Sequence, residues 1–189
     1  NGSIDAADKV IIDNLTPKFT GGLNLGVSWK NLSLFGQFSF TYGGKIYNLD
    51  EQLLRSTELG YDDVMKNKPD YILDRWTQEN QSSRYPRFVV GAHGAQNETG
   101  WNDRPSTLYL FDASFLKLNK LTLSYNLPQN WIQKLGMTSC SVYLSGENLF
   151  TLKNKKLNVP DPEAALTSGI AQKGVPSPRS FMIGLDLTF

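Results

Sequence analysis

The carboxyl-terminal stretch from Arg179 to Phe189 alternates without exception between apolar side chains and mostly polar ones. Side chains on a β-strand point alternately to its two faces, so this stretch predicts one apolar face and one mostly polar face. The apolar face carries Phe181, Ile183, Leu185, Leu187 and Phe189, and the other face carries Ser180, Met182, Gly184, Asp186 and Thr188. A strand between lipid and a wet interior has this pattern, with aromatic residues at the membrane interface.

The composition excludes several classes of protein. The net charge of the 189-residue chain is +1, which gives no reason to expect a nucleic-acid partner. No apolar run approaches the roughly 18 residues of a membrane helix. The single cysteine, Cys140, cannot form a disulfide within the chain, and we expect it to be a structural residue without a chemical role. The sequence opens without an initiator methionine or a signal peptide, so we expect a piece of a longer protein.

Two further strands follow one another near the beginning of the chain. Residues 18–29 and 32–43 each alternate, and the two-residue joint Lys30–Asn31 predicts a hairpin between them. Their apolar faces carry Phe19, Leu23, Leu25, Val27 and Trp29 in the first strand, and Leu32, Leu34, Phe38, Phe40 and Tyr42 in the second. No charged residue occupies these faces, where Lys or Arg at the middle of a bilayer would cost about 2–4 kcal/mol.

A soluble β-sandwich would also exclude charge from such faces, so the absence of charge does not decide between the two folds. The strands are close to the 9–11 residues of a tilted membrane strand and are long for a globular protein. Their opposite faces carry Thr, Ser, Asn, Gln and Gly rather than the Lys and Glu usual outside a sandwich. Both observations favour an all-β, antiparallel transmembrane β-barrel.

The third and fourth strands are predicted at residues 111–127 and 139–151. In the third, Lys117 and Asn119 interrupt an apolar face that would join Phe111, Ala113 and Phe115 to Leu121. Either a bulge shifts the register there, or Leu116 and Leu118 contact something inside the barrel. Residues 128–136 predict about one helical turn that ends at a glycine. The fifth strand is residues 179–189.

Two long polar segments, residues 44–110 and 153–178, separate these strands, with short helices expected at 48–59 and 70–76. Long loops of barrels lie outside the cell and short turns lie in the periplasm. We therefore expect both segments, together with residues 1–17, to be extracellular, residues 18–189 to supply barrel strands, and Phe189 to be periplasmic. Five strands cannot close a barrel, so the remaining strands would come from upstream sequence or from other chains.

The beginning of the chain contains half of a calcium-loop pattern. If Gly2 is the sharp-turn glycine, Asn1, Ser3, Asp5 and Asp8 take the fifth, seventh, ninth and twelfth positions of the loop. Calcium is the cofactor that this pattern predicts. The alternative is an Asn-Gly turn followed by a capped helical turn.

The long segments offer candidates for binding but none for catalysis. Trp76, Tyr85 and Trp101 could contact a sugar, a peptide or a lid protein, although such aromatic residues more often hold a loop in place. His93 is the only histidine and supports neither a metal site nor a triad. Acidic residues such as Asp161 and Glu163 have no evident partner, and a solvated loop accounts for them.

Several stretches together resemble the SusC/RagA family of TonB-dependent outer-membrane transporters. They are Asn1–Asp8 followed by Pro17–Phe19, then Asp112–Leu118, Leu123–Pro128, Val142–Phe150 and Pro178–Phe189. The chain departs from the family mainly in length, because the plug, the TonB-contacting segment and roughly three quarters of the barrel are absent.

The resemblance implies that these are the last five strands of a barrel of about 22. It implies TonB-driven import of oligosaccharides or peptides across the bacterial outer membrane, a SusD-like lipoprotein over the extracellular loops, and the remaining barrel and plug as partners. Phe189 would belong to the signal read by the barrel assembly machinery. We therefore expect a transporter segment without enzymatic activity. The alternatives are a soluble or surface-attached β-sandwich that binds glycans, and an outer-membrane enzyme or adhesin on a smaller barrel.

Overall fold

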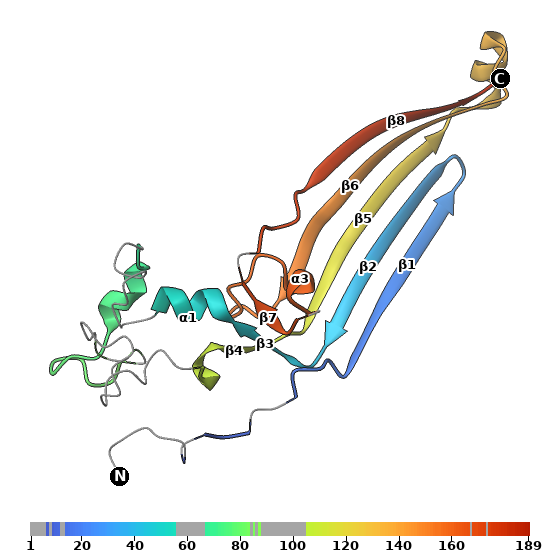
Figure 1. Cartoon of the computed structure of the whole chain (residues 1–189). Coiled ribbons are helices and arrows are strands. Elements are labelled where there is room, and N and C mark those ends of the chain that lie inside the picture. The colour runs from blue at the N-terminus through green and yellow to red at the C-terminus, as the bar shows by residue number, and fades with distance from the viewer. Residues whose placement is uncertain are drawn as a thin grey trace.

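An antiparallel sheet and a smaller mixed sheet make up the computed structural model of this chain. It describes residues 7, 9–11, 14–55, 67–83, 85, 87, 105–166, 168–172 and 174–189. A five-stranded sheet extends over most of the length of the molecule, and a three-stranded sheet lies at one end of it (Figure 1). Among the described residues, no helix has the length and apolar character needed to cross a membrane.

The large sheet confirms the predicted strands, with one exception discussed below. Its strands, in spatial order, are β1 (Phe19–Trp29), β2 (Leu32–Tyr42), β5 (Phe115–Asn126), β6 (Ser139–Lys153) and β8 (Ser180–Thr188). All four neighbouring pairs are antiparallel. The large sheet is therefore antiparallel, and its strands follow one another across the sheet in the order of the sequence.

The apolar residues of the five strands line up in rows across one face of the sheet. One row crosses every strand and consists of Val27, Leu34, Leu123, Leu144 and Ile183. The exposed fractions of these side chains are 67, 45, 40, 48 and 80%. The three-stranded sheet lies at the end of the large sheet and does not cover this face, which argues against the β-sandwich alternative (Figure 1).

A β-bulge at Asn119 resolves the interrupted pattern of the third strand. Leu118 pairs with Phe38 and Lys120 pairs with Gln37, so Asn119 is an extra residue relative to β2. Because the bulge absorbs this residue, the leucines on both sides of it share the apolar face, while both lysines lie on the polar face. Of the two alternatives given above, the bulge is confirmed.

The prediction of a strand at residues 111–127 is wrong at the beginning of that range. Residues Leu110–Asp112 form β4, which pairs with β3 (Lys45–Asn48) in the small sheet, and β7 (Ile170–Ala171) joins β3 in parallel. The chain changes sheets at Ala113 and Ser114, because the Ala113 N–H donates to Gly44 O and Ser114 Oγ accepts from the Gly43 N–H. Phe111 and Ala113 therefore do not share a face with Leu121.

The buried hydrophobic core lies in the small sheet and its helices. We call the loop cluster the unit formed by β3, β4, β7, α1 (Leu49–Arg55) and α3 (Pro162–Leu166). Its core residues are Ile46, Phe111, Ala113, Leu157, Val159, Ala165 and Ala171. Ile46 belongs to the first long segment, 44–110, Phe111 and Ala113 directly follow that segment, and the other four belong to the second, 153–178. The two segments therefore fold together rather than as separate loops.

Shorter elements complete the described part of the chain. At the end opposite the loop cluster, α2 (Gln129–Ile132) and η4 (Gln133–Leu135) form the expected helical turn (Figure 1). It ends at Gly136, whose φ of 71° is in the left-handed region that favours glycine. The helix expected at 70–76 is the 3₁₀ helix η2 (Asp70–Asp74), and η3 (Thr107–Tyr109) precedes β4.

The bulge predicts that two single-residue deletions in β5 have opposite effects on assembly. Deleting Asn119 from the intact protein removes the extra residue but leaves every neighbour on its present face, so we expect assembly to continue. Deleting Thr122 moves Leu123 and Tyr125 to the polar face, and we expect assembly to be lost. The measurement is the fraction of cell-produced protein that migrates as a folded species on SDS gels before heating. Equal yields of the two variants would contradict the assignment of faces.

Candidate functional site

The polar face of the large sheet is lined mainly by uncharged side chains that bond to one another across strands. Ser28 Oγ lies 2.9 Å from Ser33 Oγ, and Thr122 Oγ1 lies 3.1 Å from Ser145 Oγ. The charged residues on this face of the described strands are Lys117, Lys120, Glu147, Lys153 and Asp186. Hydroxyl and amide side chains of this kind suit a face that contacts water.

Tyr143 and Gly184 face each other on this polar face of the large sheet, which we call the polar wall. A Cβ at Gly184 would overlap the Tyr143 ring, so the ring lies across the glycine, where no side chain intervenes. Glycine is therefore required at this close approach. The aromatic ring covers the bare backbone of β8 at that point.

An ion-pair cluster joins the polar wall to the loop cluster. Lys117 Nζ on β5 lies 2.8 Å from Asp161 Oδ2 and 2.9 Å from Glu163 Oε2, at the beginning of α3. The side chains of Lys117 and Asp161 are only 6% and 9% exposed. The structure therefore corrects the expectation that Asp161 and Glu163 are simply solvated: both contact a strand lysine that is distant in sequence.

The Asp161 carboxylate is held in its charged form. Burial alone would raise its pKa, but hydrogen bonds from Lys117 and Ser177, together with the charge of Lys117, bring the pKa below the ordinary value of 3.8. Ser177 Oγ donates to Oδ2 at 2.9 Å, and the Glu163 N–H donates to Oδ1 at 3.1 Å. Asp161 thus ties together β5, α3 and the end of the second long segment.

A second polar cluster connects the two long segments inside the loop cluster. The Glu51 side chain, on the buried side of α1, accepts from Tyr71 Oη at 2.9 Å and from Asn158 Nδ2 at 3.4 Å. Asn48 Nδ2 donates to Asn158 O at 3.1 Å, and Asn48 Oδ1 accepts from the Glu51 N–H at 3.0 Å. These contacts, like the β3–β7 pairing, were not predicted from the sequence.

The aromatic candidates have different surroundings. Tyr85 stacks on Tyr71 at 5.4 Å between ring centroids, and Tyr85 O accepts from the Trp76 N–H at 2.9 Å. These contacts fit the loop-pinning interpretation of Tyr85. The Trp76 side chain is 38% exposed. Trp101 lies outside the described residues, and a role of any of the three in binding stays a prediction.

The remaining predicted sites are not tested by the structure. The four candidate calcium ligands, Asn1, Ser3, Asp5 and Asp8, lie outside the described residues, as does His93. Phe189 follows β8 and is 82% exposed. Within the described ranges, no group of three or more His, Cys, Asp or Glu side chains is arranged to hold a metal ion.

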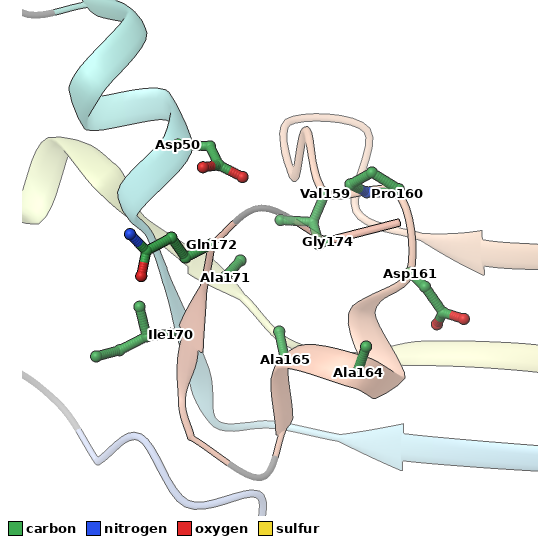
Figure 2. Close-up of a pocket in the computed structure, with 10 residues that line it drawn as sticks. All are labelled: Asp50, Val159, Pro160, Asp161, Ala164, Ala165, Ile170, Ala171, Gln172 and Gly174. Carbon is green, nitrogen blue, oxygen red and sulfur yellow. The ribbon is translucent and has the colours of Figure 1, made fainter. Parts of the chain in front are cut away.

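A small pocket lies between α3, β7 and the beginning of α1 (Figure 2). Its volume is about 50 Å³, which is enough for a few water molecules but not for a sugar or a dipeptide. Asp50 lies on one side, and the Asp161 carboxylate points away from the other lining residues (Figure 2). This pocket is therefore not a candidate for binding a sugar or a peptide.

Comparison with known proteins identifies relatives over the whole chain, although no protein-family model matches it. The chain is 29% identical over 199 residues to the TonB-dependent receptor P3 of Formosa agariphila. It is 27% identical over 190 residues to the TonB-dependent receptor SusC of Bacteroides thetaiotaomicron. Both alignments cover 100% of this chain but only 18% and 17% of the relatives. The chain thus spans less than a fifth of the length of these curated relatives.

Solved structures give the same result. The chain is similar to the RagAB peptide importer in its closed-closed state, with a TM-score of 0.78 and 29% sequence identity. A structure of the RagAB peptide transporter gives a TM-score of 0.79 at the same identity. Each comparison covers 98% of this chain and 19% of the other chain.

The lowered pKa of Asp161 predicts how the second long segment responds to acid. A carboxylate with a lowered pKa in the folded state contributes stability above its ordinary pKa of 3.8, and this contribution is lost as the pH falls through the folded value. Lys117, Glu163 and Lys153 are the charged groups around it. We expect amide hydrogen exchange in residues 153–178, corrected for its intrinsic pH dependence, to stay constant between about pH 8 and pH 5 and to accelerate below about pH 4.

The Asp161→Asn variant is the control for this pH dependence. Removing one partner of a buried pair typically costs about 3–5 kcal/mol. We therefore expect faster exchange in this segment at every pH, without the acid step. An acid step that persists in Asp161→Asn would show that another group is responsible.

Proposed function

We propose that this chain is one region of a SusC/RagA-type TonB-dependent transporter, and that it forms five membrane-spanning strands and two extracellular segments of an outer-membrane importer. In this proposal the apolar face meets lipid and the polar face lines the interior of the barrel. The chain contributes wall and loops, and we assign it no catalytic step.

The observation that carries the proposal is the exposed apolar row that crosses all five strands. A contiguous apolar surface of this extent is rare on a soluble monomer, where it would favour aggregation. The same surface is suited to hydrocarbon, because its positions carry no charge. The similarity of the whole chain to TonB-dependent receptors supports lipid as the medium.

Connection lengths support an orientation in the membrane. Both long segments fold together at one end of the sheet, and the short connections at Lys30–Asn31 and at 128–137 lie at the other. Because barrels place short turns in the periplasm, we propose that the loop cluster is extracellular and that Phe189 is periplasmic. There Phe189 would serve as part of the assembly signal.

The names of the relatives support a class of cargo and a set of partners. RagAB is described as a peptide importer, and SusC as a TonB-dependent receptor. We propose peptides or oligosaccharides as cargo, TonB as the source of energy, and a SusD-like lipoprotein seated on the extracellular segments. The exposed Trp76 is our candidate for contact with cargo or with that lipoprotein.

A matched pair of arginine substitutions on β8 tests which face meets lipid. Leu185 lies on the apolar face and Met182 on the polar face, and the two side chains are 64% and 44% exposed. We expect Leu185→Arg to lower the folded yield in the outer membrane strongly, because the charge costs about 2–4 kcal/mol in lipid. Met182→Arg should have little effect. A similar loss for both variants would contradict the proposed orientation.

Import itself is tested in cells that carry or lack the intact transporter. The probes are a protein digest and a mixture of oligosaccharides, and mass spectrometry measures which components disappear from the medium. We expect depletion of one class only in cells that carry the transporter, and its loss when an uncoupler collapses the proton-motive force. Depletion that is unaffected by the uncoupler would contradict TonB-dependent import.

A further inference from the structure

The part of the second long segment around α3 lies on the polar side of the large sheet, at the end of the sheet from which β5 begins. Lys117, which holds α3, pairs with Ser39 on β2 and Thr151 on β6, and these positions belong to the polar face. In Figure 1, α3 lies against the ends of β5 and β6 nearest the loop cluster. Since Asp161 and Glu163 both reach this lysine, α3 must sit on the polar side of the wall.

Three attachments hold this segment to the wall along its length. Near its beginning, Lys153, which is the last residue of β6 and the first of this segment, donates from Nζ to Val159 O. In the middle, Lys117 Nζ binds Asp161 and Glu163. At its end, Asn148 Nδ2 on β6 donates to Pro178 O at 3.0 Å. Segment 153–178 is therefore fastened at its beginning, middle and end to two adjacent strands.

The same segment is also fixed on the side away from the wall. Asn158 O accepts a hydrogen bond from Asn48 Nδ2, and Asn158 Nδ2 donates one to the Glu51 carboxylate; both partners belong to the first long segment. Val159 and Ala165 are buried in the shared core. These contacts leave little freedom for α3 to move outward while Lys117 keeps its partners. The position of α3 on the polar side of the sheet and its contacts on both sides indicate that this segment folds inward over the sheet and is held there.

We propose that residues 153–178 form a constriction at the extracellular mouth of the channel, with Lys117 as the positioning residue that keeps α3 over the polar wall. Such a constriction limits the width of the cargo, so that narrow extended chains pass more readily than branched or bulky ones. The inference rests on the proposed function, because the polar face lines a channel only if the apolar face meets lipid.

The test measures how large a reagent can reach α3 on intact cells. A cysteine is placed at Ala164, an exposed residue of α3, in a cysteine-free transporter that includes Cys140→Ser. Small and bulky polyethylene-glycol maleimides are then compared. We expect the small reagent to label position 164 readily and the bulky one at least about tenfold more slowly, whereas Thr107→Cys on the first segment reacts with both.

Releasing Lys117 should remove the size barrier. With Lys117→Gln, we expect labelling of position 164 by the bulky reagent to rise about tenfold or more. Lys120→Gln is the matched control, because Lys120 lies on the same face of β5 but its pair with Glu147 is 4.0 Å long and exposed. That variant should leave labelling unchanged. If Lys117→Gln does not assemble, the double variant Asp161→Asn with Glu163→Gln must show the same rise.

Two results would overturn the constriction. One is equal labelling of positions 164 and 107 by the bulky reagent in the parent transporter. The other is an unchanged size barrier in a folded variant that has lost the Lys117 cluster. Neither result depends on import, so the constriction can fail while the Leu185→Arg comparison and the uptake measurement still support the transporter.

Discussion

The separation of apolar and polar side chains onto the two faces of one sheet is the constraint on which the rest of this structure depends. Each strand must keep its apolar side chains on one face over about ten residues, because a slip of one position exchanges the faces. The bulge at Asn119 shows how strict this requirement is. It absorbs one residue and thereby keeps Lys117 and Lys120 off the face that carries Leu116 and Leu123. Because the apolar face of the large sheet is exposed, the buried core of the chain forms elsewhere, in the loop cluster.

The features that could be predicted from the sequence are those with a local pattern. Five strands, the hairpin at Lys30–Asn31 and the turn that ends at Gly136 follow from alternation and from turn residues over a few positions. The small sheet lacks such a signal, because β3, β4 and β7 are only two to four residues long. Without a period to read, Phe111 and Ala113 looked like a continuation of the third strand.

The contacts of the candidate site depend on residues too far apart for a pattern to connect. Lys117 and Asp161 are 44 positions apart, and Asn48 and Asn158 are 110 apart. The sequence did contain one usable signal, because Lys117 is a charge inside a strand that is otherwise rich in leucine. A lysine in such a place needs a partner when it is buried. Only the fold identifies that partner as the beginning of α3.

The small sheet brings together three segments that are separated along the chain. β3 follows β2, β4 precedes β5, and β7 lies between β6 and β8, so four strands of the large sheet have an end attached to one compact unit. The core of that unit is buried within the chain, whereas the apolar face of the large sheet is exposed. The loop cluster therefore fixes the ends of these four strands relative to one another.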